Sequence, residues 1–78
     1  MKKNYTLRFE AWNKPGILYR ITGIFLRRKI NVERLEAKPT EKEGISEGTF
    51  VVLADEETIN KVMQQIKKVV EVEKVELL

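Results

Sequence analysis

Residues Tyr5–Leu18 read YTLRFEAWNKPGIL, and the spacing of the apolar side chains changes in the middle of this stretch. Before Asn13 the apolar residues alternate with polar ones, which predicts a half-buried strand over Tyr5–Trp12. After Gly16 they recur at helical spacing up to about Lys29, as Ile17, Leu18, Ile21, Ile24 and Phe25. The stretch therefore predicts a strand, a tight turn over Asn13–Gly16 and a helix.

The rest of the chain continues this alternation of strands and helices. Ile30–Lys38 predicts a second strand, and the polar segment Pro39–Gly44 a turn. Gly48–Ala54 predicts a third strand, and Asp55 is a suitable N-cap for a helix that ends at Lys67 and Lys68. A last strand follows over Val70–Leu78, so the element order is β-α-β-β-α-β.

Two strands carry additional signals. In Ile30–Lys38 the apolar phase slips between Val32 and Leu35, as a β-bulge would cause. In Gly48–Ala54 the run Phe50–Leu53 is apolar on both faces, so we expect the second face of this strand to be covered. Gly23 stands inside an otherwise favourable helix, and we expect it to permit close packing.

This order predicts an α+β, ferredoxin-like fold in a single domain over residues 1–78. Right-handed crossovers place both helices on one face of a four-stranded antiparallel sheet. A core of this size is marginally stable, which favours a partner surface. The fold alone does not decide the function, because the same architecture serves unrelated functions.

Composition excludes several classes of function. The chain has no cysteine and no histidine, so disulfides, the usual zinc sites and imidazole-activated nucleophiles are absent. We therefore expect no enzyme, no metal site and no cofactor. No apolar run is long enough for a signal peptide or a bilayer span, and we expect a cytoplasmic protein without a membrane partner.

The turn Asn13–Gly16 is the best candidate for a binding site. The first N–H groups of the following helix have no intrahelical partner and lie at the positive end of the helix dipole, which suits a carboxylate. Gly16 leaves the backbone uncovered, and the Asn13 amide can both donate and accept. Two interpretations remain open from these residues: a simple strand-to-helix turn, or a site for a free amino acid. Asn31 either faces the same turn or only marks a helix-to-strand junction.

An ordered set of residues resembles the N-terminal ACT domain of acetolactate synthase small subunits. The resemblance covers essentially the whole chain. Its residues are Asn13-Lys14-Pro15-Gly16-Ile17-Leu18, Arg20, Gly23-Ile24-Phe25, Arg28, Asn31-Val32-Glu33, Pro39-Thr40, Ile45-Ser46, Thr49 and Val72-Glu73-Lys74-Val75.

The resemblance implies a regulatory domain that gives feedback control of branched-chain amino-acid biosynthesis. It implies side-by-side pairing into a homodimer and an amino-acid effector, valine, leucine or isoleucine, at the subunit interface. It also implies a catalytic acetolactate synthase partner. Carried over onto this sequence, the effector site comprises Asn13, Lys14, Pro15, Gly16, Ile17 and Asn31.

The sequence departs from the family pattern at three points. Lys29 stands where these subunits usually have glycine, and Lys38 stands where a small uncharged residue is common near the effector. A lysine at this position would either extend into solvent or select an acidic ligand. The chain is also expected to lack the C-terminal domain that family members carry.

Two other functions remain as alternatives. The first is an ACT-type module that pairs and contacts a partner without binding an effector. The second is an RNA-binding domain of the same strand order, whose third-strand signature Glu47–Leu53 faintly resembles. Residues 1–38 hold ten Lys and Arg against three Glu, which indicates either a footprint for an acidic partner or a solvated helix end. An RNA-binding domain requires aromatic side chains on the open face of the sheet, and Val52, two residues after Phe50, supplies none.

Overall fold

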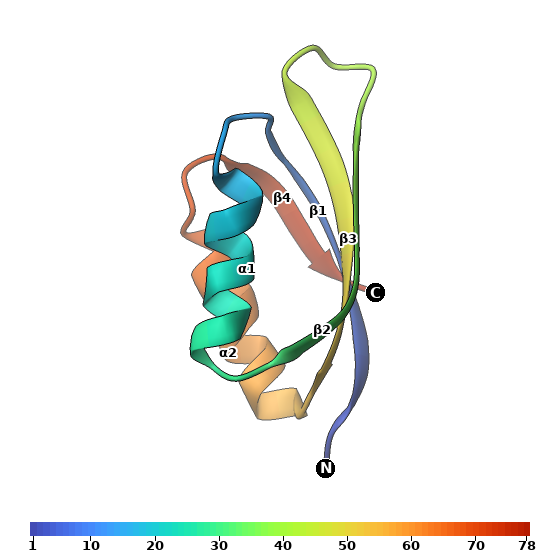
Figure 1. Cartoon of the computed structure of the whole chain (residues 1–78), viewed down its shortest axis with the longest axis vertical. Coiled ribbons are helices and arrows are strands. Elements are labelled where there is room, and N and C mark those ends of the chain that lie inside the picture. The colour runs from blue at the N-terminus through green and yellow to red at the C-terminus, as the bar shows by residue number, and fades with distance from the viewer.

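The computed structural model describes all 78 residues and has the predicted element order. The strands are β1 (Lys3–Trp12), β2 (Asn31–Pro39), β3 (Ile45–Ala54) and β4 (Val72–Leu77), and the helices are α1 (Ile17–Arg27) and α2 (Glu56–Lys67). The strands form one antiparallel sheet in the order β2-β3-β1-β4, and both helices lie against one face of it (Figure 1). The ferredoxin-like prediction is confirmed.

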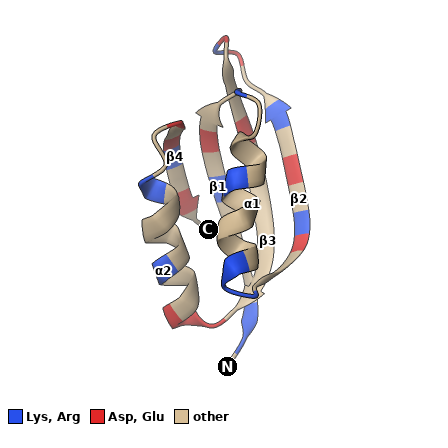
Figure 2. Ribbon diagram, turned by 60° about the vertical axis from the view of Figure 1, so that its left-hand side comes forward, with Lys and Arg blue, Asp and Glu red and all other residues tan.

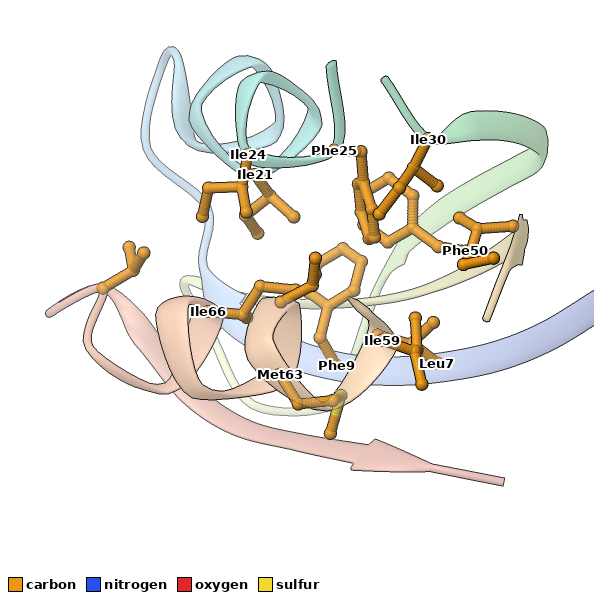
Figure 3. Close-up of a cluster of buried hydrophobic side chains, with 14 of the residues drawn as sticks. Leu7, Phe9, Ile21, Ile24, Phe25, Ile30, Phe50, Ile59, Met63 and Ile66 are labelled. Atoms are coloured by element: carbon orange, nitrogen blue, oxygen red, sulfur yellow. The ribbon is translucent and has the colours of Figure 1, made fainter. Parts of the chain in front are cut away.

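The core lies between the sheet and the two helices. Along β1 the alternation predicted from the sequence is observed, because Leu7, Phe9 and Ala11 are buried while Arg8 and Trp12 are exposed. Figure 3 shows the buried side chains of both helices meeting those of the sheet. The helices contribute Ile17, Ile21, Ile24 and Phe25 from α1 and Ile59, Val62, Met63 and Ile66 from α2.

The ends of α1 are set by two residues with left-handed backbone conformation. Gly16 has φ +85° and is the N-cap, so the helix begins one residue after the predicted start. At the other end the N–H groups of Lys29 and Ile30 donate to the carbonyls of Leu26 and Phe25, and Lys29 has φ +57°. This is the Schellman arrangement, in which the left-handed position usually belongs to glycine.

The strand boundaries differ from the predicted ones by up to three residues. β3 begins at Ile45 rather than Gly48, because β1 pairs with it along its whole length, up to Trp12 opposite Ile45. β4 begins at Val72 rather than Val70, because Val72 donates its N–H to Val69 in a turn after α2. The predicted bulge in β2 is confirmed by the register shift between Val32 and Arg34.

Two expectations about packing are not met within the chain. The face of the sheet away from the helices, called here the open face, carries Val51 and Leu53 with no layer over them. Gly23 permits no close packing either, since a Cβ there would have only Nη2 of Arg27 near it, at 3.6 Å. Gly48 is the tightly packed glycine, because a Cβ there would lie 2.4 Å from the Phe9 ring.

Neither helix is long and apolar enough to cross a membrane.

Candidate functional site

The turn between β1 and α1 is held from two sides by backbone hydrogen bonds. Asn13 donates its N–H to the carbonyl of Gly44, at the tip of the β2–β3 hairpin, over 2.7 Å. Trp12 donates to the carbonyl of Glu71, in the loop before β4, over 2.9 Å. Figure 1 shows the turn at the end of the molecule from which the hairpin projects. The turn is therefore fixed by residues that are distant in the sequence.

The N-terminus of α1 is open, in contrast to that of α2. The N-cap Gly16 offers no side-chain hydrogen bond, and the first turn contains no acidic residue. By comparison, α2 is capped by Asp55, whose carboxylate accepts from Thr58 N–H at 2.8 Å, and Glu56 and Glu57 follow. Only α1 therefore presents an uncompensated positive helix end.

The free donors at this end are not quite those expected. Ile17 donates its N–H to the carbonyl of Lys14 at 3.2 Å, whereas the N–H groups of Gly16, Leu18 and Tyr19 have no acceptor within the chain. No atom lies within 4 Å of the position that a Cβ would occupy on Gly16. The N-terminus of α1 can therefore receive a small anion, with Leu18 rather than Ile17 among the donors.

A hollow of about 260 Å³ adjoins the turn on the helix side of the sheet. Asn13 and Ile17, two of the predicted site residues, border it, and most of its lining is apolar. Its residues are Phe9, Ala11, Trp12, Asn13, Ile17, Leu18, Ala37, Lys38, Pro39 and Ser46. A helix end with free N–H donors beside a small apolar hollow has the chemistry to hold a carboxylate next to an aliphatic group.

Asn31 lies apart from the other predicted site residues. Asn13–Ile17 precede α1 and begin it, whereas Asn31 follows the helix and starts β2. An 11-residue helix separates the two ends by about 16 Å. Within one chain the structure brings Asn13–Ile17 together and leaves Asn31 at the opposite end of α1.

The Lys38 side chain points away from the hollow. Lys38 is paired with Glu47 in the sheet register, and its Nζ lies 3.5 Å from the Glu47 carboxylate, with the side chain 75% exposed. The neighbouring Ala37 pairs with Gly48 and faces the helix side, where Phe9 fills the space above the glycine. The lysine therefore extends into solvent on the open face, which favours the first of the two interpretations of this departure.

The open face does not resemble an RNA-stacking surface. Phe9 and Phe50 are buried on the helix side, with ring centroids 5.4 Å apart. Charged residues of both signs alternate along β2 (Figure 2). A hollow of about 240 Å³ on this face is lined mainly by such residues, including Arg8, Glu36 and Glu47. Trp12 is the only aromatic side chain on this face, and a single ring at the end of one strand disfavours the RNA-binding alternative.

Sequence reasoning missed Trp12. This residue ends β1, borders the hollow and has its ring against Gly44, where a Cβ would lie 3.4 Å from Cζ3 of the indole. No local pattern indicates this contact, because the two residues are 32 positions apart. Gly44 has φ +81°, a left-handed conformation that glycine adopts readily in a turn such as this hairpin tip.

Comparisons with known proteins find acetolactate synthase small subunits among the relatives of this chain. Residues 7–74 match the family model described as AHAS small subunit-like ACT domain. The chain is 38% identical over 71 residues to a probable acetolactate synthase small subunit of Archaeoglobus fulgidus, covering 91% of this chain and 45% of that protein. It is 35% identical over 74 residues to the chloroplastic acetolactate synthase small subunit 2 of Arabidopsis thaliana, covering 95% and 16%.

A solved structure agrees with these relatives. The crystal structure of the acetolactate synthase small subunit from Thermotoga maritima superposes with a TM-score of 0.84 and is 29% identical. The match covers 96% of this chain and 47% of that one. The chain thus spans about half the length, or less, of the small subunits that it matches.

Proposed function

Because the chain belongs to the AHAS small subunit-like family of ACT domains, we propose that it is a regulatory domain that binds a free amino acid. The effector is valine, leucine or isoleucine, and its binding gives feedback control of an acetolactate synthase. The observation that carries the proposal is the open N-terminus of α1 beside an apolar hollow. The domain is regulatory rather than catalytic.

The proposed binding mode follows from the chemistry of the site. The carboxylate of the amino acid accepts from the free N–H groups of Gly16 and Leu18, and the positive end of the α1 dipole stabilises its charge. The oxygen of the Asn13 or Asn31 amide accepts from the ammonium group. The aliphatic side chain occupies the hollow beside Ile17.

The exposed flank beside β2 supports pairing with a second copy. β2 is an edge strand that bonds only to β3, so its outer N–H and C=O groups are free. Arg20 and Arg28 of the α1 segment bond to Glu71 and Gln65, on the α2 side. Apolar residues lie exposed away from those contacts, namely Leu26 on α1, 64% exposed, and Leu35 on β2, 41% exposed.

Pairing of two β2 edges would complete the site. If two β2 strands pair antiparallel about a two-fold axis at Leu35, the Asn31 end of one strand lies beside the Pro39 end of the other. Pro39 borders the hollow beside the Asn13–Ile17 turn. Asn31 thus belongs to the effector site of the second copy, which reconciles its distance from the turn within one chain with its predicted role.

Regulation requires that the effector favours one arrangement of the paired domains. A coupling free energy of about 1 to 3 kcal/mol changes the affinity or activity of a bound enzyme by roughly 5- to 150-fold. The names of the relatives point to the catalytic subunit of acetolactate synthase as the partner on which this coupling acts.

The test is a thermal-shift panel of the twenty amino acids on the purified chain. A ligand at 100 times its Kd adds about 2.7 kcal/mol, which raises the midpoint of a domain this small by about 10 °C or more. We expect such a shift with at least one of valine, leucine and isoleucine. The absence of any shift would contradict effector binding and leave a pairing module without an effector.

A further inference from the structure

Trp12 and the hairpin tip together hold the first residue of the effector turn. The Trp12 ring lies 3.4 Å from the position that a Cβ on Gly44 would occupy, and the carbonyl of the same Gly44 accepts the Asn13 N–H at 2.7 Å. Trp12 ends β1 and Asn13 begins the turn, so two consecutive residues of the chain meet the same hairpin residue, Gly44. The position of Asn13 is therefore set by the hairpin.

The hairpin tip is itself a rigid support. The Thr40 N–H donates to Ile45 O at 3.0 Å, the Thr40 hydroxyl donates to the same carbonyl at 2.9 Å, and Lys42 donates its N–H to that hydroxyl at 3.1 Å. These bonds span the tip on the side where Gly44 lies. Because the hairpin tip is held by its own hydrogen bonds, its Gly44 carbonyl can fix the position of Asn13 in the turn.

The Trp12 ring is half-exposed, at 43%, and belongs to the face opposite Phe9 and Ala11. A Cβ on residue 44 would lie in ordinary van der Waals contact with the ring, at 3.4 Å and 3.5 Å, so it is the backbone conformation of Gly44, with φ +81°, that favours glycine there. A large aromatic side chain that remains half-exposed contributes less burial than a core residue does. Gly44 is the neighbour through which the ring is connected to the Asn13 backbone.

We propose that Trp12 is a positioning residue for effector binding: its ring seats Gly44, and Gly44 O fixes the Asn13 backbone so that the turn is preorganised. This inference rests on the proposed function. Without the ring the competent arrangement of the turn is less populated, and the apparent Kd rises in proportion to that loss. Trp12 acts through Asn13.

The test compares Trp12→Ala and Trp12→Phe with the unaltered chain. L-valine, L-leucine and L-isoleucine are titrated separately by calorimetry, and exchange of the Asn13 amide proton is followed by NMR. We expect Trp12→Ala to weaken binding about tenfold and to accelerate Asn13 exchange, because opening of the Asn13–Gly44 bond becomes more frequent. Trp12→Phe keeps a flat ring on Gly44 and should restore most of both properties.

Leu77→Ala is the matched control. Leu77 is a similarly half-exposed apolar residue, at 38%, near the end of β4 and far from the turn. We expect its loss to affect stability without changing Asn13 exchange or effector affinity. If Trp12→Ala binds with unchanged affinity while the unaltered chain binds, the inference is wrong and the proposed function stands. If the unaltered chain binds none of the three amino acids, both are overturned.

Discussion

The ammonium group of Lys38 lies 3.5 Å from the carboxylate of Glu47, on the face of the sheet opposite to the hollow beside the Asn13–Ile17 turn. The pair is solvent-exposed, so its contribution to stability is small. The pair shows which way the Lys38 side chain points: its amine lies on the open face and not among the apolar side chains of the hollow. We therefore expect that Lys38 does not select an acidic effector.

Because Lys38 points away from the hollow and Ala37 faces it, substitutions at these two neighbouring residues should have different effects. Lys38→Ala should change the affinity for a branched-chain amino acid by less than about twofold, and glutamate and aspartate should bind neither protein. Ala37→Leu, on the adjacent residue that faces the hollow, should weaken binding about tenfold or more by filling that space. Calorimetric titrations measure both, and a large loss in Lys38→Ala would place the amine in the site.

Lys29→Gly should stabilise the protein by about 1 kcal/mol. Lys29 has φ +57° at the end of α1, where a side chain is strained and glycine is not. The matched control is Lys68→Gly at the end of α2, where φ is −84° and glycine brings only the entropic cost of a freer unfolded chain. Urea unfolding should show opposite signs for the two variants. Destabilisation of both would contradict the strain at Lys29.

Gly48→Ala should destabilise the fold by about 2 kcal/mol or more. Its Cβ would lie 2.4 Å from the Phe9 ring and 2.7 Å from the backbone carbonyl of Glu36, so core and sheet must shift. Gly23→Ala is the control, because its Cβ meets only Nη2 of Arg27 at 3.6 Å and alanine favours the helix by about 1 kcal/mol. Equal effects in urea unfolding would show that the packing around Gly48 is looser than described.

Asp55 should give α2 a pH-dependent cap. Hydrogen bonds from Thr58, by its side chain and its backbone N–H, hold the pKa of the Asp55 carboxyl below its usual value of 3.8. Because the pKa of Asp55 is lower in the folded chain than in the unfolded chain, the stabilisation by its charge is complete at pH values above the unfolded pKa. It is lost as the pH falls below about 3.8 and through the folded pKa.

Asp55→Asn isolates this effect, because asparagine is as good an N-cap and carries no charge. Between pH 7 and pH 2.5 the melting temperature of the unaltered chain should fall more steeply than that of Asp55→Asn, and the difference should develop below pH 4. Asp55→Ala should be less stable than both at neutral pH. Parallel melting profiles for the first two proteins would show that the charge does not contribute.

Local patterns were sufficient to predict the fold. The alternation in β1, the helical spacing after Gly16 and the phase slip between Val32 and Leu35 each depend on neighbouring residues, and all three are observed, the slip as a register shift between Val32 and Arg34. Strand boundaries depend also on pairing partners that are distant in the sequence: β3 begins at Ile45 because Trp12 of β1 lies opposite it. The expected close packing at Gly23 is wrong, because the surroundings of a helix residue depend on the tertiary structure and not on its neighbours in the sequence.

The candidate site was predictable only in part. The turn Asn13–Ile17 is contiguous in the sequence, and its helix-end chemistry can be deduced from residue types. The direction of Lys38 depends on the register of β2 with β3, and the contact of Trp12 with Gly44 spans 32 positions. Asn31 lies at the far end of α1, and the proposed function places it in the site of a second copy.

A complementation titration tests this shared site most directly. Gly16→Asp places a carboxylate at the N-terminus of α1, and Asn31→Ala removes the proposed contact from the second copy. Each variant alone should form dimers and bind no valine, leucine or isoleucine. Gly16→Asn is the control for the first, because asparagine tolerates φ +85° as aspartate does and carries no charge.

When the two defective chains are refolded together in equal amounts, half of the dimers contain one of each. Every mixed dimer then has one intact site, formed by the turn of the Asn31→Ala chain and the Asn31 of the Gly16→Asp chain. Calorimetry should recover binding at about one quarter of all sites, with an affinity like that of the unaltered protein. Mixed dimers without any recovered binding, or full binding by Asn31→Ala alone, would contradict a site shared between two copies.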